Sequence, residues 1–184
     1  MRRRTGLASR PGVRQRVVRQ RPLLAICSLL TVAALGLQVA RIVEAAPSSF
    51  ELLKAGNERA DADGNRTWDS KVSLLARKPC AIWQYKEARR YAPSHRCKLV
   101  DFAPCAEAHA RFSGALRELS RVLGAGWKLE EDRNETGIVR TSLRRKQGPV
   151  VMVDFVPLQG LGRCDVNLNV DAYQEGTARG GGPG

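Results

Sequence analysis

The spacing of apolar residues changes twice along the chain and so marks three kinds of segment. Residues 23–40 are predominantly apolar and carry no charged side chain. Residues 105–123 place apolar residues three and four positions apart, which is the period of a helix with one buried face. From residue 127 onward apolar and polar residues alternate, which is typical of antiparallel strands with one face in water.

The helix expected at residues 105–123 has a regular buried stripe and a defined end. The stripe is formed by Phe112, Leu116, Leu119 and Leu123. Gly124 follows at once, and glycine tolerates the left-handed conformation that often ends a helix. Gly114 lies inside the helix, where a glycine either permits close packing or lowers helix stability by about 1 kcal/mol.

Four strands are expected after the helix, at residues 127–134, 138–146, 150–156 and 164–173. The first strand should turn Trp127 and Leu129 inward. The last alternates most regularly, with Asp165, Asn167, Asn169 and Asp171 facing outward. We therefore predict an α+β domain at residues 80–173, in which one amphipathic helix packs on a four-stranded antiparallel sheet. Within it, residues 80–104 should lie beside the sheet as a loop-rich segment.

The apolar run follows directly after an arginine-rich start. Its 18 residues reach the lower limit of about 18 that a helix needs to span a bilayer. The preceding arginines favour keeping the N-terminus on the cytoplasmic side. We therefore predict a signal-anchor or a signal-peptide helix at residues 23–43, and a signal peptide would be cleaved after Ala45. The chain from residue 47 onward then lies outside the cytoplasm, on a single-pass membrane protein or on a secreted one.

Three further segments complete the expected organisation. Residues 1–22 lack apolar periodicity and are expected to form a disordered, basic cytoplasmic tail. Residues 47–79 read as a juxtamembrane linker with one short helix, and residues 174–184 as a disordered glycine-rich tail. Asn65 and Asn134 each begin an Asn-x-Thr triplet, which is a glycosylation signal only in an organism that glycosylates exported proteins.

The net charge of +13 is concentrated near the N-terminus. Residues 1–46 hold nine arginines against one acid, whereas residues 47–184 hold 22 basic and 17 acidic residues, a net charge of +5. An arginine-rich end usually indicates nucleic-acid binding. Here it runs into an apolar segment, so we expect the membrane, through residues 23–43, and not a nucleic acid to be its partner.

Export changes the interpretation of the cysteines. Outside the apolar run there are four of them, and an oxidising compartment makes disulfides the default for an even number. Four cysteines allow three pairings, and spacing alone does not choose among them. We favour Cys80 with Cys97 and Cys105 with Cys164.

A zinc site is the alternative for the same stretch of sequence. His95, Cys97, Cys105 and His109 offer two thiolates and two imidazoles, which tetrahedral zinc accepts. The close cysteine pair of most structural zinc sites is missing, however, and a zinc site would leave Cys80 and Cys164 unexplained. A Cys105–His109 nucleophile pair lacks an orienting partner. We therefore prefer disulfides and expect no cofactor.

Basic residues are candidates for an anionic partner in two places. Aromatic and basic residues are interleaved around Lys86, Arg89 and Arg90. The second expected strand ends with further basic residues, namely Arg140, Arg144, Arg145 and Lys146. A solubilising charge pattern is the competing interpretation, and we give it more weight.

Signatures of catalysis are missing from the sequence. It contains no Gly-x-Ser-x-Gly elbow, phosphate-binding loop, dinucleotide fingerprint or His-Glu-x-x-His motif. We therefore expect a membrane-anchored or secreted, non-enzymatic binding domain at the cell surface, acting on a surface protein or an anionic ligand. The alternative is an exported enzyme or zinc-binding protein that uses the His95, Cys97, Cys105 and His109 cluster.

Overall fold

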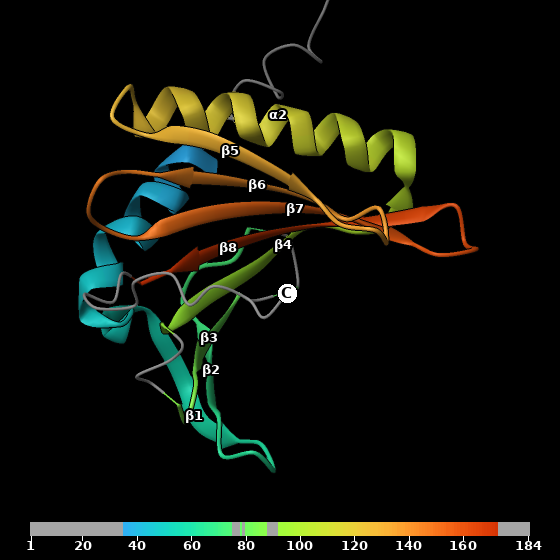
Figure 1. The fold of residues 1–184 in the computed structure, drawn as a ribbon. Coiled ribbons are helices and arrows are strands. Elements are labelled where there is room, and N and C mark those ends of the chain that lie inside the picture. The colour runs from blue at the N-terminus through green and yellow to red at the C-terminus, as the bar shows by residue number, and fades with distance from the viewer. Residues whose placement is uncertain (1–34, 75–77, 79, 88–91, 173–184) are drawn as a thin grey trace, which may run out of the picture.

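Eight antiparallel strands form one sheet, and a long helix, α2, lies across one of its faces (Figure 1). The computed structural model describes residues 35–74, 78, 80–87 and 92–172. Strand order across the sheet is β1-β2-β3-β4-β8-β7-β6-β5. The sheet therefore consists of two meanders, β1 to β4 and β5 to β8, which meet where β4 pairs with β8.

The elements follow one another along the chain without long interruptions. Helical residues 35–45 lead into two short 3-10 turns, Ala46–Ser48 and Glu51–Leu53. The first meander contains β1 (Lys54–Ala60), β2 (Arg66–Ser70), β3 (Ala81–Gln84) and β4 (Ser94–Pro104). Helix α2 (Cys105–Leu123) connects it to β5 (Lys128–Arg133), β6 (Val139–Arg144), β7 (Val150–Leu158) and β8 (Arg163–Asp171).

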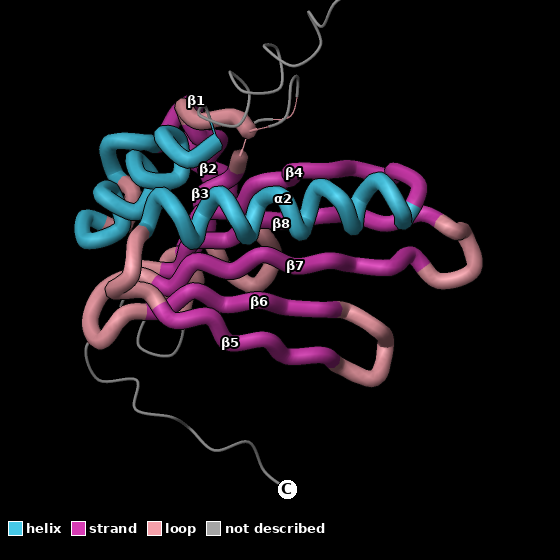
Figure 2. The backbone as a smooth tube through the Cα atoms, turned by 90° about the horizontal axis from the view of Figure 1, so that it is seen from above, coloured by secondary structure: helices cyan, strands magenta, loops and turns pink. Residues whose placement is uncertain are grey.

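Helix α2 carries the chain from the middle of the sheet to its far edge. It contacts β4, β8 and β7. Seen from above, β5 and β6 lie to one side of the helix and are not covered by it (Figure 2). Strand β5 is therefore exposed along its whole length. Leu129, which the alternation predicts to be inward, is 52% exposed because no helix covers this edge.

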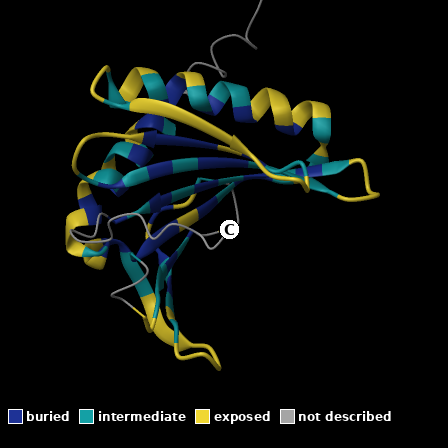
Figure 3. Cartoon of the chain, in the orientation of Figure 1, coloured by how far each residue is buried: buried dark blue, intermediate teal, exposed yellow. Residues whose placement is uncertain are grey.

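The core lies between the sheet and a layer made of α2 and residues 35–53. Strand β8 contributes its inward side chains, all fully buried: Cys164, Val166, Leu168 and Val170. Helix α2 buries Ala108, Phe112, Ala115 and Leu119 against them. Figure 3 shows this contrast between buried inner strands and the exposed outer side of α2. Burying a side chain of this size contributes about 1.5–3 kcal/mol, so these contacts between α2 and β8 stabilise the domain.

The helix expected at residues 105–123 has those bounds, and the four strands expected after it are confirmed to within two residues at each end. The expected four-stranded sheet is wrong, because residues 47–79 supply β1 and β2 and residues 80–104 supply β3 and β4. Their strand pattern is disguised by polar residues on the inner face. Ser70 and His95 both point into the core, at positions where alternation normally places apolar side chains.

The expected N-terminal membrane helix also needs correction. Residues 35–43 belong to the domain, because Val39 and Ile42 are fully buried in its core. No described helix combines the length and the apolar character needed to cross a membrane. The rest of the 23–43 segment, residues 23–34, lies outside the described residues, as do the tails at 1–22 and 174–184.

Candidate functional site

A cavity of about 590 Å³ opens beside α2, and we call it the α2 groove. It lies between α2, the helical residues 35–45, the segment after β2 and strand β4. Its apolar walls are formed by Leu35, Leu74, Leu99, Ala110, Gly114 and Ala115. Its polar lining consists of Gln38, Ser73, Arg111, Arg117, Glu118 and Arg121. The volume falls in the range of about 300–1,000 Å³ that is usual for small-molecule sites.

The period of α2 explains why the groove is open. Positions 110, 114, 117 and 121 are separated by four, three and four residues, so they share one side of the helix. Two of them are small, Ala110 and Gly114. A Cβ atom added at Gly114 would meet a single side-chain atom, Arg117 Nη2, at 4.0 Å. The small residues therefore leave space where longer side chains would fill the groove.

The groove is positively charged at its rim. Arg111, Arg117 and Arg121 are exposed, and none has an ion pair with a carboxylate of the described residues. The acidic member of the lining, Glu118, is buried, and its Oε1 accepts the backbone N–H of Gly36 at 2.9 Å. Three cations therefore face one carboxylate that is already engaged, and the rim attracts anions.

Gln38 adds an unused hydrogen-bond acceptor to the groove. Its side-chain oxygen is buried and accepts no hydrogen bond from any residue that the structure describes. An unsatisfied buried polar atom is unfavourable by about 1–3 kcal/mol. A hydroxyl group or water in the groove would satisfy it.

These groove residues were not predicted from the sequence to form a site. The available signal was the stripe of small residues with arginines beside it on the side of α2 that faces away from the predicted core. Periodicity identified the buried stripe correctly, but the outer arginines resembled an ordinary solvated helix face.

The basic residues selected from the sequence are not brought together. Arg140 Nε and Nη2 donate to Asp154 at 2.7 and 3.0 Å, and Arg144 lies 3.4 Å from a Glu130 oxygen. Both arginines are on the sheet face opposite α2, because they lie on the other side of β6 from the buried Val139, Thr141 and Leu143. Arg140 therefore has no free charge to offer an anion.

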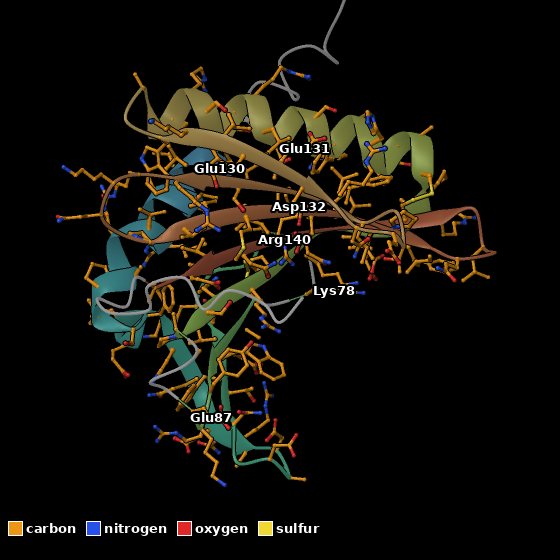
Figure 4. The ribbon with its side chains drawn as sticks, viewed as in Figure 1. Lys78, Glu87, Glu130, Glu131, Asp132 and Arg140 are labelled. Atoms are coloured by element: carbon orange, nitrogen blue, oxygen red, sulfur yellow. A yellow bond between two sulfur atoms is a disulfide. The ribbon has the colours of Figure 1, made fainter. Side chains whose placement is uncertain are left out.

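The remaining members of that predicted set are scattered. Arg145 stacks over the Trp127 ring at 5.3 Å, and it lies with the exposed Lys146 in the turn after β6. Lys86 follows β3 on the arm formed by β1 to β3, next to Glu87, which Figure 4 places far from Arg140. Arg89 and Arg90 lie outside the described residues.

The outward row of β8 forms a polar network on the face opposite α2. Asn169 Nδ2 donates to Asp154 at 3.0 Å, so this carboxylate serves both Asn169 and Arg140. Burial raises the pKa of Asp171 in spite of a hydrogen bond from Ser94. The polar groups of this network pair with one another, which favours a structural role for this face.

The four cysteines among the described residues form disulfides, in the pairing favoured from the sequence. Cys80 is bonded to Cys97, and Cys105 is bonded to Cys164. The second bond ties the first residue of α2 to β8. Two disulfides indicate an oxidising compartment outside the cytoplasm, because reducing conditions in the cytoplasm keep thiols free.

The four residues considered for zinc are divided between two places. His109 is exposed and packs edge-on against Phe155, with ring centroids 5.8 Å apart. His95 is fully buried, and its Nε2 lies 2.8 Å from Ser70 Oγ. Burial lowers the pKa of His95 from 6.5 to about 4, so its ring is neutral at neutral pH.

Comparison of the chain with protein-family models, with curated proteins and with solved structures finds no match. Inference about function therefore rests on the chemistry of the α2 groove and of the cysteine–histidine cluster.

Proposed function

We propose that this protein is an exported, non-enzymatic binding domain that holds an amphipathic anion in the α2 groove. The proposal is supported above all by three arginines at the rim of an apolar cavity, none of which forms an ion pair with a carboxylate in the part of the chain that the structure describes. The proposed ligand is an anion, as expected from the sequence. Its proposed site, however, is on α2 and not on the residues selected from the sequence.

The groove combines the two kinds of contact that an amphipathic anion needs. Its apolar walls, including Leu35, Leu74 and Leu99, would remove a hydrocarbon chain from water, which contributes about 25 cal/mol for each Å² buried. Arg117 and Arg121 lie one helical turn apart at the rim. Guanidinium groups bind carboxylates and phosphates through paired hydrogen bonds, each contributing about 1.5–3 kcal/mol when one partner is charged.

The lining favours binding over catalysis. Within the described lining there is no histidine or cysteine, and the hydroxyl of Ser73 donates to the Lys78 carbonyl at 2.9 Å. Glu118 is held by the Gly36 N–H. A nucleophile with an adjacent base, which covalent catalysis requires, is therefore not supplied by these side chains.

The test compares ligands that differ only in charge. Full-length protein, free of alkyl detergent, is titrated with a fluorescent long-chain fatty carboxylate, with its methyl ester and with a trimethylammonium analogue. We expect the carboxylate to bind at least ten-fold more tightly than either analogue. Vesicles of anionic phospholipid, compared with zwitterionic vesicles, distinguish a membrane lipid from a free fatty acid as the source of the ligand.

Two variants and a matched control locate the site. Arg117→Ala with Arg121→Ala should weaken carboxylate binding at least ten-fold, and Gly114→Leu should weaken all three probes by filling the groove. Arg144→Ala with Arg145→Ala removes the same charge at the end of β6 and in the turn after it, outside the lining of the groove, and should leave binding unchanged. Loss of binding in this control, or equal affinity for ester and carboxylate, would overturn the proposal.

A further inference from the structure

Cys80, His95 and Cys97 bring their ligand atoms together inside the core. The two sulfurs and a ring nitrogen lie within 4.8 Å of one another. Cys80 directly precedes β3, which pairs with β4, and its partner Cys97 lies on β4 two residues after His95. Alternate residues of a strand share a face, so His95 and Cys97 point to the same side. All three side chains are at most 4% exposed.

The distance between His95 and one sulfur fits a tetrahedral metal site, and the two sulfurs, which are bonded to each other in the disulfide, must separate on reduction before both can bind a metal. His95 Nδ1 lies 3.6 Å from Cys97 Sγ. Bonds of about 2.0 Å to nitrogen and 2.3 Å to sulfur, opened to a tetrahedral angle, put these atoms about 3.5 Å apart. The other ring nitrogen of His95 is held by Ser70 Oγ at 2.8 Å, and Ser70 Oγ also accepts the Val72 N–H at 3.0 Å. Such an outer contact orients a histidine that binds metal.

We propose that the dithiol form of the protein binds one Zn²⁺ through Cys80, Cys97 and His95 Nδ1, and that closure of the disulfide releases it. Binding displaces two thiol protons, because the ligands are thiolates. Oxidation by a small-molecule disulfide, such as oxidised glutathione, then joins the two sulfurs. The two electrons pass to the oxidant, which leaves as two thiolates, and Zn²⁺ departs because its sulfur ligands are consumed.

The second disulfide provides an internal control. Cys105 and Cys164 form no such group with a histidine or carboxylate of the described residues. Zinc should therefore slow the oxidation of Cys80 and Cys97 and leave the oxidation of Cys105 and Cys164 unchanged.

The first test uses Co²⁺ as an optical substitute for Zn²⁺. Full-length protein is reduced with a phosphine under anaerobic conditions and titrated with Co²⁺. We expect one equivalent to bind, with a thiolate-to-cobalt charge-transfer band and visible bands of tetrahedral cobalt. Cys80→Ser and His95→Gln should each lose this spectrum, whereas Cys105→Ala with Cys164→Ala should keep it. A reduced protein without the bands, or a His95→Gln variant that retains them, would contradict the proposal.

The second test follows oxidation and does not depend on the variants folding normally. Reduced wild-type protein is oxidised with oxidised glutathione, with and without one equivalent of Zn²⁺, and the disulfide peptides are quantified by mass spectrometry. Zinc should slow formation of Cys80–Cys97 at least ten-fold and leave Cys105–Cys164 unchanged. Equal slowing of both bonds, or of neither, would show that zinc binds elsewhere or not at all.

Discussion

Glu118 of α2 accepts a hydrogen bond from the backbone N–H of Gly36 at 2.9 Å, and this contact joins the N-terminal helical residues to α2. The approach is so close that a Cβ atom at Gly36 would lie 2.5 Å from Val122 Cγ2. A real Cβ cannot be placed there without movement, so glycine at position 36 is a packing requirement. The contact also sets the width of the α2 groove, which both helices line.

This packing predicts that one substitution compensates for the loss of stability caused by another. Gly36→Ala should lower the free energy of unfolding by about 1–3 kcal/mol, because overpacking forces the helices apart. Val122→Ala removes the obstructing methyl groups and should restore most of that loss in the double variant. Urea denaturation of the four proteins in the cycle measures the coupling. Simple additivity of the two substitutions would show that the helices do not meet at this point.

The burial of residues 35–45 predicts where the exported chain begins. Cleavage after Ala45 would remove the fully buried Val39 and Ile42 and one wall of the groove. Deleting two such side chains costs about 2–5 kcal/mol each, which a domain of this size does not tolerate. We expect the N-terminus of the exported protein, read by intact mass, to lie at or before residue 35. An exported, folded chain that starts at Ala46 would refute this.

The two ion pairs that β6 forms through Arg140 and Arg144 should differ sharply in their contribution to stability. Asp154 is 5% exposed and accepts from both Arg140 and Asn169. Asp154→Ala should therefore lower the free energy of unfolding by about 2 kcal/mol, because two donors lose their acceptor. Arg144→Ala breaks an exposed pair with Glu130 and should change it by at most about 0.5 kcal/mol. Denaturant midpoints of the two variants, compared with the parent, measure this difference.

His95 should make the disulfide-bonded protein sensitive to acid. Its pKa is lowered by burial from 6.5 to about 4, so the unfolded chain binds a proton between these values and the folded chain does not. Stability should therefore fall as the pH falls from about 6.5 to 4, by about 3 kcal/mol in total. Denaturation at several pH values checks this.

A matched pair of variants isolates the contribution of His95. His95→Gln does not titrate and should flatten the fall in stability between these pH values. His109→Gln replaces an exposed histidine and should keep the steep fall. If both variants behave like the parent, the folded protein binds a proton at His95 in this pH range and the pKa of His95 is not lowered.

Strong local periodicity made the C-terminal half of the domain predictable. Residues 105–123 and the alternating strands after them carry one apolar face each, and both patterns survive in the fold. The first four strands were missed because their inner faces include His95 and Ser70, whose burial is stabilised by their mutual hydrogen bond. Alternation cannot reveal a strand when the inward residue is polar and finds its partner on a distant strand.

The α2 groove could not be predicted for a related reason. Its arginines come from one helix, but its apolar walls come from residues as far apart as Leu35 and Leu99. The pattern of apolar residues identifies the face by which a helix packs. It does not show the cavity that remains between two packed helices. The disulfide pairing could not be derived from the spacing of the cysteines either, although the favoured one of the three possible pairings is the one in the structure.

The pairing of β4 with β8 has a consequence for the order of folding. The two meanders are adjacent along the sheet only through this pair, and β8 is the last described strand of the chain. Each meander can form from local contacts. Pairing β4 with β8 must in addition close a loop of about sixty residues, and the conformational entropy lost on closing this loop slows the step. A chain emerging from a ribosome or translocon therefore stays divided in two until residue 171 is free, and the Cys105–Cys164 bond then locks the two halves together.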